Sequence, residues 1–299
     1  MTVEATPRRD VVQTTAPPPR RRRRRGGSTP WAVARHAMLV GICLLAIYPL
    51  AFVLLTALKT QGAYADDPLG LPWPITFDNF GEALRGGEFF TWFKNSVILT
   101  VGSVALATCS AALAAFAIAR MRWRGQNLLL SINVALMIVP PVVILIPLFV
   151  LFVDLSLVST YRGVIMVYAG LTIPFSVYLL TMFFRTVPHE ILESALADGA
   201  SHFRILVQIV LPMSMPALVT LVVVNALWVW NELLIALVFL PSDELKTLMV
   251  GITVFRSRYN LDIPITMAGM LLSSLPMLAL YFVGQRYFIR GLIAGAVKG

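Results

Sequence analysis

Polar side chains interrupt the fifth of six long apolar runs, and these residues are the best suited in the chain to bind a small polar molecule. Asn225, Trp228, Asn231 and Glu232 all fall within residues 217–240. Polar residues inside a membrane span are costly and usually face a cavity or another helix. Taken as one helix rising about 1.5 Å per residue, the run places Asn231 about 13 Å from its end. That depth is near the middle of a hydrocarbon core about 30 Å thick.

Two interpretations of these polar residues are open. Aromatic faces together with amide and carboxylate groups suit a sugar, so the residues can line a substrate pathway, with Ser273 of the sixth run as a further candidate. Alternatively, Asn231 and Glu232 join this chain to the helices of a second membrane subunit, which would satisfy their hydrogen bonds equally well.

The sequence contains no recognisable catalytic centre. No phosphate-binding loop of the form G-x-x-x-x-G-K-[ST] is present, so we do not expect the chain to hydrolyse ATP itself. His189-Glu190 starts like the H-E-x-x-H pattern of a zincin helix, but Glu193 stands where the second His would be. Cys43 and Cys109 have neither metal-ligand nor disulfide spacing, and we interpret them as small core residues. We therefore predict no metal and no cofactor in this chain.

Composition indicates a membrane protein. Hydrophobic residues make up 58% of the 299 positions and charged residues 13%, whereas soluble proteins average about 25% charged residues. A spanning helix needs about 20 apolar residues, and six runs reach this length. The sequence thus predicts an all-α, polytopic protein with six transmembrane helices, at about 37–58, 93–119, 128–152, 163–184, 217–240 and 266–287.

Charge predicts the orientation. Residues 1–30 contain Pro17–Pro19 and an unbroken arginine run, and we expect a disordered basic tail that anchors topology, rather than a binder of anionic lipid or nucleic acid. Six spans put both termini on one side, and most of the 24 Lys and Arg residues fall on that side. The positive-inside rule then predicts a multi-pass protein of the cytoplasmic membrane with both termini in the cytoplasm.

A polar, helical segment, residues 188–216, separates the fourth and fifth runs. We expect two short helices, with Gly199 turning the chain at positive φ and Ser201 capping the second helix. Helices this short are marginal in water, which favours a partner surface. The alternative is an amphipathic helix lying on lipid, but only His202 and Arg204 are basic in its second helix.

This segment resembles the EAA loop of ABC importer membrane subunits, whose pattern is E-A-A, three residues, G, nine residues, I-x-L-P. Every spacing fits, and Ser194 in place of the first Ala is the one departure. Asp198-Gly199-Ala200 resembles the form found in sugar importers. Trp230-Asn231-Glu232 and the C-terminal residues 285–299 are similar to the maltose-type carbohydrate permeases, and the likeness covers about 31–299.

The resemblance implies a MetI-like fold and a non-catalytic permease subunit that imports a carbohydrate, here expected to be an oligosaccharide. Its implied partners are a second homologous permease, two ATPase subunits that carry ATP and Mg, an extracytoplasmic sugar-binding protein and membrane lipid, but no nucleic acid. The domain would be 31–299 with its coupling loop at 188–216. The residues implied in ATPase coupling are Glu193, Ser194, Ala195, Asp198, Gly199, Ile209, Leu211 and Pro212.

Residues 241–265 are predicted to form a polar external loop. In the maltose-type family a loop here reaches the sugar-binding protein, which implies docking by Arg256, Arg258, Tyr259 and Asn260; the alternative is a solvated connector. For the whole chain, alternatives to a carbohydrate importer are a glycerol-phosphate or polyol importer, an ATPase-independent channel or scaffold, and an intramembrane enzyme.

Overall fold

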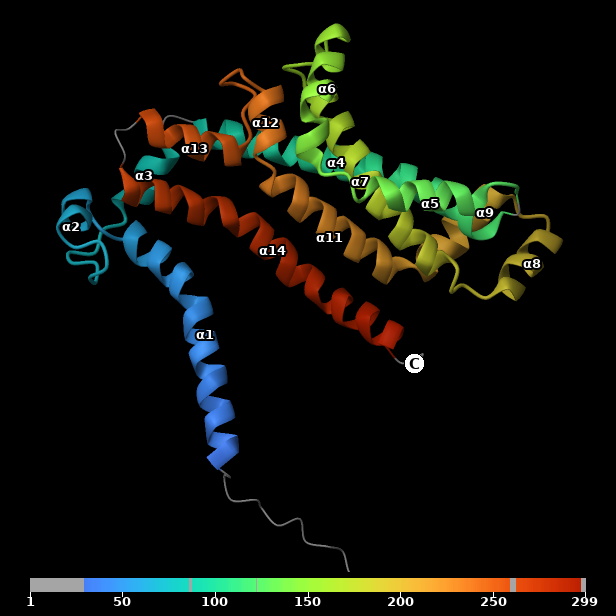
Figure 1. The fold of residues 1–299 in the computed structure, drawn as a ribbon, viewed down its shortest axis with the longest axis horizontal. Helices are drawn as coiled ribbons and strands as arrows, with labels where there is room; N and C mark the ends of the chain where they lie inside the picture. Colours follow the sequence, from blue (N-terminus) through green and yellow to red (C-terminus); the bar gives the residue numbers. More distant parts are fainter. Residues whose placement is uncertain (1–29, 86–87, 122, 259–261, 297–299) are drawn as a thin grey trace, which may run out of the picture. The chain divides into compact units, whose positions relative to one another are not determined.

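The computed structural model describes residues 30–85, 88–121, 123–258 and 262–296, and within them the regular structure is entirely helical (Figure 1). The chain divides into two units, Met1–Pro49 and Leu50–Gly299. The basic tail lies outside the described residues. In chain order the helices are α1 (Pro30–Ala57), α2 (Gln61–Asp66), α3 (Asp78–Leu84), α4 (Glu88–Arg120), α5 (Gln126–Leu136), α6 (Pro141–Asp154), α7 (Tyr161–Phe184), α8 (His189–Ala197), α9 (His202–Ile205), the π-helix η1 (Leu206–Val210), α10 (Leu211–Met213), α11 (Met215–Asn231), α12 (Leu234–Phe239), α13 (Leu248–Arg258) and α14 (Ile263–Ala296).

Four helices are long and apolar enough to cross a membrane by themselves, within Trp31–Ala57, Glu88–Arg120, Tyr161–Phe184 and Ile263–Gln285. Two bent helix pairs raise the number to six if each pair forms one span: α5 with α6, and the helical stretch His202–Met213 with α11. The all-α class and the predicted spans are thus consistent with the structure.

The packing of α4 along α7 forms the centre of the second unit (Figure 1). Ala107, Ala111 and Ala115 follow one another at four-residue spacing on α4, and all three are completely buried. Residues four apart lie on one face of a helix. A row of small side chains lets two helix backbones approach closely, as is common in membrane bundles.

The third span is broken at a pair of prolines. The Pro140-Pro141 pair separates α5 from α6, and the two helices meet at 99°. The Asn133 amide donates a 2.7 Å hydrogen bond to the carbonyl of Pro174, which fastens α5 to α7.

The prediction of a continuous fifth helix over 217–240 is wrong. α11 ends at Asn231, Glu232 adopts an extended backbone, and α12 starts at Leu234. The Glu232 carboxylate accepts hydrogen bonds from the amides of Ile235 and Ala236, at 3.0 and 3.1 Å. A carboxylate that binds free amides at a helix start stabilises that start. The depth calculated for Asn231 from one continuous helix therefore does not apply.

The prediction of a polar loop over 241–265 is also wrong, because α13 forms within it. Leu248 and Val250 are fully buried. The Asn95 side chain donates to the carbonyls of Glu244 and Lys246, at 2.8 and 2.9 Å, and fastens the preceding chain to α4. The segment from Leu245 to Ile252 is mostly apolar, and this is the signal that the prediction neglected.

The interpretation of the cysteines as core residues is wrong as well, because both Cys43 and Cys109 are exposed. A free cysteine behaves as a small apolar side chain, which an apolar surface accepts.

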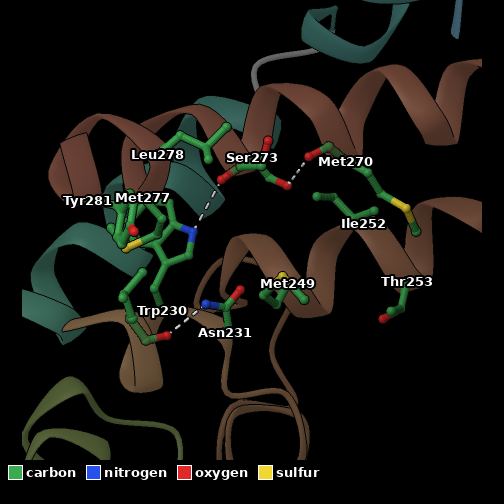
Figure 2. Close-up of a pocket in the computed structure, with 12 residues that line it drawn as sticks. Trp230, Asn231, Met249, Ile252, Thr253, Met270, Ser273, Met277, Leu278 and Tyr281 are labelled. Carbon is green, nitrogen blue, oxygen red and sulfur yellow. Dashed lines mark hydrogen bonds between the residues drawn. The ribbon is translucent and has the colours of Figure 1, made fainter. Parts of the chain in front are cut away.

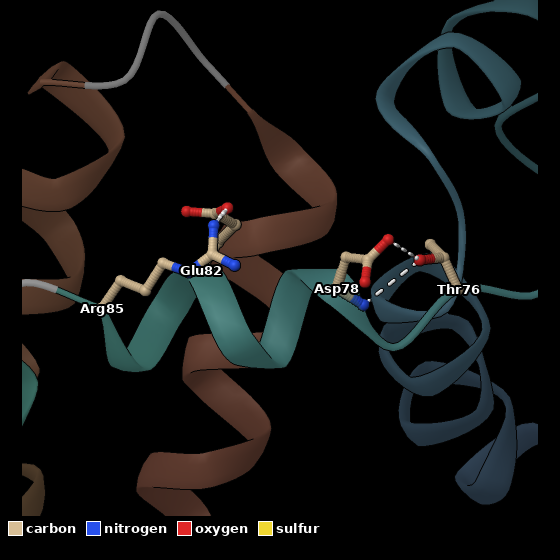
Figure 3. Close-up of polar contacts among 4 residues, drawn as sticks. All are labelled: Thr76, Asp78, Glu82 and Arg85. Carbon is tan, nitrogen blue, oxygen red and sulfur yellow. Dashed lines mark hydrogen bonds and ion pairs between the residues drawn. The ribbon is translucent and has the colours of Figure 1, made fainter.

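A polar junction leads into α3. The Thr76 hydroxyl donates to the Asp78 carboxylate at 2.9 Å and accepts from the Asp78 amide at 3.2 Å, while Arg85 pairs with Glu82 at the other end of the helix (Figure 3). The Asn79 amide donates to the carbonyls of Ala57 and Lys59, both at 2.7 Å. These contacts seat α3 against the end of α1.

Candidate functional site

The segment that resembles a coupling loop folds as two short helices around Gly199. Gly199 has φ +81°, its amide donates to the Leu196 carbonyl at 3.0 Å, and the Ala200 amide donates to the Ala195 carbonyl at 3.0 Å. This pair of bonds is a Schellman motif, the common glycine-dependent end of a helix. Ser201 then accepts a hydrogen bond from the Arg204 amide, as an N-cap does. The predicted turn and cap are both confirmed.

The inner face of this segment is part of the protein core. Leu192 of α8, together with Ile205, Leu206 and Val210, belongs to one apolar cluster with residues of α4, α7 and α11. Burying a side chain of this size stabilises a structure by about 1.5–3 kcal/mol. α8, α9 and η1, which we call the coupling segment, are therefore fixed to three of the long helices.

The outer face of the coupling segment is exposed and partly apolar. Ile191, Leu196, Phe203 and Val207 are 38%, 43%, 67% and 44% exposed, and we call these four residues the outer ridge. Exposed apolar side chains on a segment that also carries polar ones suit contact with a protein. The lipid alternative is less suitable, because acidic Glu190, Glu193 and Asp198 share the exposed surface.

The predicted coupling residues fall on both faces. Glu193, Ser194, Asp198, Gly199 and Pro212 are exposed, whereas Ala195, Ile209 and Leu211 pack partly buried against the core. Glu193 lies 3.7 Å from His189 on the surface of α8. The first group can touch a partner, and the second positions the segment.

A π-helical turn, η1, directly precedes α10, which contains Pro212. The Leu211 amide bonds back to the Leu206 carbonyl, five residues earlier. Such turns appear mostly as single insertions in helices, often at functional sites. The stretch His202–Met213 then meets α11 at 81°. The sequence pattern did not predict the π-helix.

Arg120 at the end of α4 is a residue whose role the sequence analysis missed. Its guanidinium donates to the carbonyls of Phe184 and Val187, where α7 ends and the chain turns toward α8. The last carbonyls of a helix have no partner within that helix. By the sequence alone, Arg120 counts only among the Lys and Arg residues that set topology.

Only part of the predicted substrate pathway lies together. Asn231 and Ser273 line a pocket of about 410 Å³ between α11, α13 and α14 (Figure 2). Trp230 is beside them, and its indole N–H donates to the Ser273 carbonyl at 3.2 Å. Met249 and Thr253 come from α13, which forms in the stretch predicted to be a loop.

The other predicted pathway residues do not line this pocket. The Asn225 amide is buried and donates to the Ser176 hydroxyl at 2.8 Å. Glu232 accepts from the Tyr168 hydroxyl at 2.9 Å, and the Trp228 ring lies edge-on to the Tyr168 ring, with centroids 6.0 Å apart. Their side chains are thus engaged within this chain.

The predicted docking residues cannot be placed. Tyr259 and Asn260 lie outside the described residues, and for Arg256 and Arg258 only the helical backbone of α13 is described. Within the described part of the chain, no three His, Cys, Asp or Glu side chains come close enough to hold a metal ion.

Comparison with known proteins identifies the class of transporter. Residues 107–293 match the family model "Binding-protein-dependent transport system inner membrane component". A putative ABC transporter permease from Caldicellulosiruptor sp. is 43% identical over 260 residues, covering 86% of this chain and 93% of that protein. The melibiose/raffinose/stachyose import permease MelC of Bacillus subtilis is 32% identical and covers 84% of this chain and 91% of its own length.

A solved structure has the same fold. It is a bacterial ABC transporter for import of the acidic polysaccharide alginate, with a TM-score of 0.74, 23% identity, and coverage of 86% of this chain and 96% of that chain. The MetI-like permease fold is therefore confirmed, and the passive channel, scaffold and intramembrane enzyme alternatives are set aside. The chain belongs to the family of inner membrane components of binding-protein-dependent transport systems, and it is a non-catalytic ABC importer permease.

Proposed function

We propose that this permease translocates an uncharged oligosaccharide and that its coupling segment receives the movement of separate ATPase subunits. The observation that carries the substrate proposal is the chemistry of the pocket between α11, α13 and α14. The relatives add support, since MelC is named for the import of three neutral sugars.

The polar groups of the pocket present hydrogen-bond acceptors. The hydroxyls of Ser273, Ser274 and Thr253 donate to backbone carbonyls of their own helices, at 2.8, 2.8 and 2.7 Å. The Asn231 amide nitrogen does the same at 2.7 Å. Their oxygens remain available as acceptors. Sugar hydroxyls can donate to such oxygens, and a mostly apolar lining with a few polar groups is usual for small-molecule sites.

The pocket is poorly suited to an anion. Its described lining residues include no Lys, Arg or His. A phosphate brought into a partly buried site without a cation or donors would lose its hydration uncompensated. This argues against the glycerol-phosphate alternative, and the volume of about 410 Å³ is in the usual range of about 300–1,000 Å³ for small-molecule sites.

The exposed outer ridge supports the proposal for coupling. Glu193, Asp198 and Gly199 share the exposed surface with it, while Ala195, Ile209 and Leu211 hold the segment to α4, α7 and α11. An ATPase attached there would move these helices because the segment is continuous with their core. Two ATPase subunits, carrying ATP and Mg, and a second permease complete the assembly that we propose.

The coupling segment follows the C-terminal end of α7, which Arg120 contacts. The helices α12 and α13 lie toward the other end of α7 (Figure 1). We propose that both termini are cytoplasmic. The coupling segment would then lie in the cytoplasm, where ATP is available, and α13 would lie outside. The preceding loop and α13 would then face the binding protein.

Uptake by the complete transporter in proteoliposomes tests the proposal. The panel contains labelled neutral oligosaccharides, an oligouronate and glycerol phosphate, each with and without ATP and binding protein. We expect saturable, ATP-dependent uptake of a neutral oligosaccharide only. ATP-dependent uptake of glycerol phosphate, or of the oligouronate in preference, would contradict the substrate proposal.

A further inference from the structure

Arg120 connects the long helices to the coupling segment at the corner where α7 ends. Its guanidinium donates to the carbonyl of Phe184, the last residue of α7, and to that of Val187, two residues before α8. One side chain of α4 therefore holds both sides of this corner.

One acceptor of Arg120, the Phe184 carbonyl, lies at the C-terminus of α7. The carbonyls at a helix C-terminus carry the negative end of the helix dipole, so a cation there is favourable without a carboxylate partner. Both hydrogen bonds leave from one guanidinium nitrogen, Nη2, whose N–H groups are held in the plane of the rigid guanidinium. Lysine carries the same charge, but the N–H groups of its ammonium rotate freely on a flexible stem.

The surroundings of the corner are packed on the apolar side. Phe184 is fully buried, Val187 is 5% exposed, and both belong to the cluster that contains Leu192 of α8. A corner held by apolar packing alone can pivot about those contacts, whereas two directed hydrogen bonds fix its angle. Arg120 thus adds orientation to a contact that is already buried.

We infer that Arg120 is a positioning residue for energy coupling, fixing the α7–α8 corner so that displacement of the coupling segment moves α4 and α7 together. The inference rests on the proposed function of the coupling segment. Without Arg120, the segment still binds its ATPase, because the outer ridge is unchanged. The α7–α8 corner can then bend, so that part of the displacement of the coupling segment is not transmitted to α4 and α7.

The test compares Arg120→Ala, Arg120→Lys and the control Arg124→Ala in the complete transporter. Arg124 is exposed and lies four residues after Arg120. Its replacement removes the same positive charge near the same end of α4, and so has the same effect on membrane orientation. The readouts are the amount of ATPase that copurifies, the ATP hydrolysis rate, and substrate uptake per ATP hydrolysed. The last readout would not move if Arg120 contributed only to folding.

We expect R120A to copurify with normal ATPase and hydrolyse ATP, with uptake per ATP lower by about fivefold or more, the lower end of typical coupling interactions. R120K should fall between R120A and the wild type, and R124A should match the wild type. Wild-type uptake per ATP in assembled R120A would overturn the inference while leaving the proposed function intact. If R120A assembles too poorly for uptake to be measured, R120K serves as the test variant. Normal complex yield together with normal uptake per ATP in R120K would overturn the inference. Failure of the wild-type chain to copurify with any ATPase would instead refute the proposed function itself.

Discussion

The Tyr168 hydroxyl donates a 2.9 Å hydrogen bond to the Glu232 carboxylate and thereby joins α7 to the break between α11 and α12. The same carboxylate accepts from the amides of Ile235 and Ala236. Glu232 is thus a helix-starting residue with a tyrosine partner inside the chain.

Two replacements of Glu232 distinguish the contribution of its hydrogen bonds from that of its charge. Glu232→Leu removes every acceptor and leaves the Tyr168 hydroxyl and two amides unpaired, which should cost about 1–3 kcal/mol for each buried group left unsatisfied. Glu232→Gln keeps an acceptor oxygen and should cost less. Thermal unfolding of the purified protein in detergent measures both, and equal midpoints for the Leu variant and the wild type would contradict the capping role.

The turn at Gly199 offers a graded test of the coupling segment. Proline cannot adopt φ +81° and would remove the amide that bonds the Leu196 carbonyl. Gly199→Pro should abolish ATP-dependent uptake while membrane insertion stays normal. Asparagine tolerates the left-handed region, so Gly199→Asn is the matched control and should retain most uptake. Normal uptake by the proline variant would refute the assignment of this turn.

Asn231 and Asn225 on the same helix should respond differently to the same substitution. Asn231 lines the pocket, so Asn231→Leu should lower uptake about threefold to tenfold, equivalent to one hydrogen bond, without loss of stability. Asn225 is buried against Ser176, so Asn225→Leu should lower the unfolding temperature instead. Both variants are measured in uptake assays and in thermal unfolding. A lower unfolding temperature for Asn231→Leu together with a stable Asn225→Leu that has lost uptake would contradict this assignment.

Close packing of α13 on α4 can be tested at Gly251. A Cβ there would lie 2.2 Å from the Trp92 ring, so Gly251→Ala should destabilise the protein by about 1–3 kcal/mol through overpacking. Gly170 on α7 has no neighbour within 4 Å of such a Cβ, and Gly170→Ala should be neutral or stabilising. Equal unfolding temperatures for the two variants would show that α13 does not pack here as described.

Features determined by local sequence were predictable. The Gly199 turn, the Ser201 cap and the break at Pro140-Pro141 follow from backbone preferences that act over a few residues. The positions of the long apolar helices follow from composition and length.

Features that depend on contacts between distant segments were not predictable in this way. Glu232 interrupts an apolar run because Tyr168, 64 residues earlier, and the amides of α12 satisfy it. Arg120 reaches carbonyls 64 and 67 residues later. Both side chains were visible as anomalies in or beside apolar runs, but their partners appear only in the fold.

We propose that the outer ridge of the coupling segment binds the ATPase, and the amount of ATPase that copurifies with the permease reports this binding. Phe203, the most exposed ridge residue at 67%, is changed to Asp, and Phe77, 71% exposed outside the coupling segment, is changed to Asp as the control. We predict that F203D reduces the copurified ATPase about tenfold or more, as expected when an interface loses about 1.4 kcal/mol or more, while F77D retains it. Equal amounts of ATPase with F203D and with the wild type would contradict the claim.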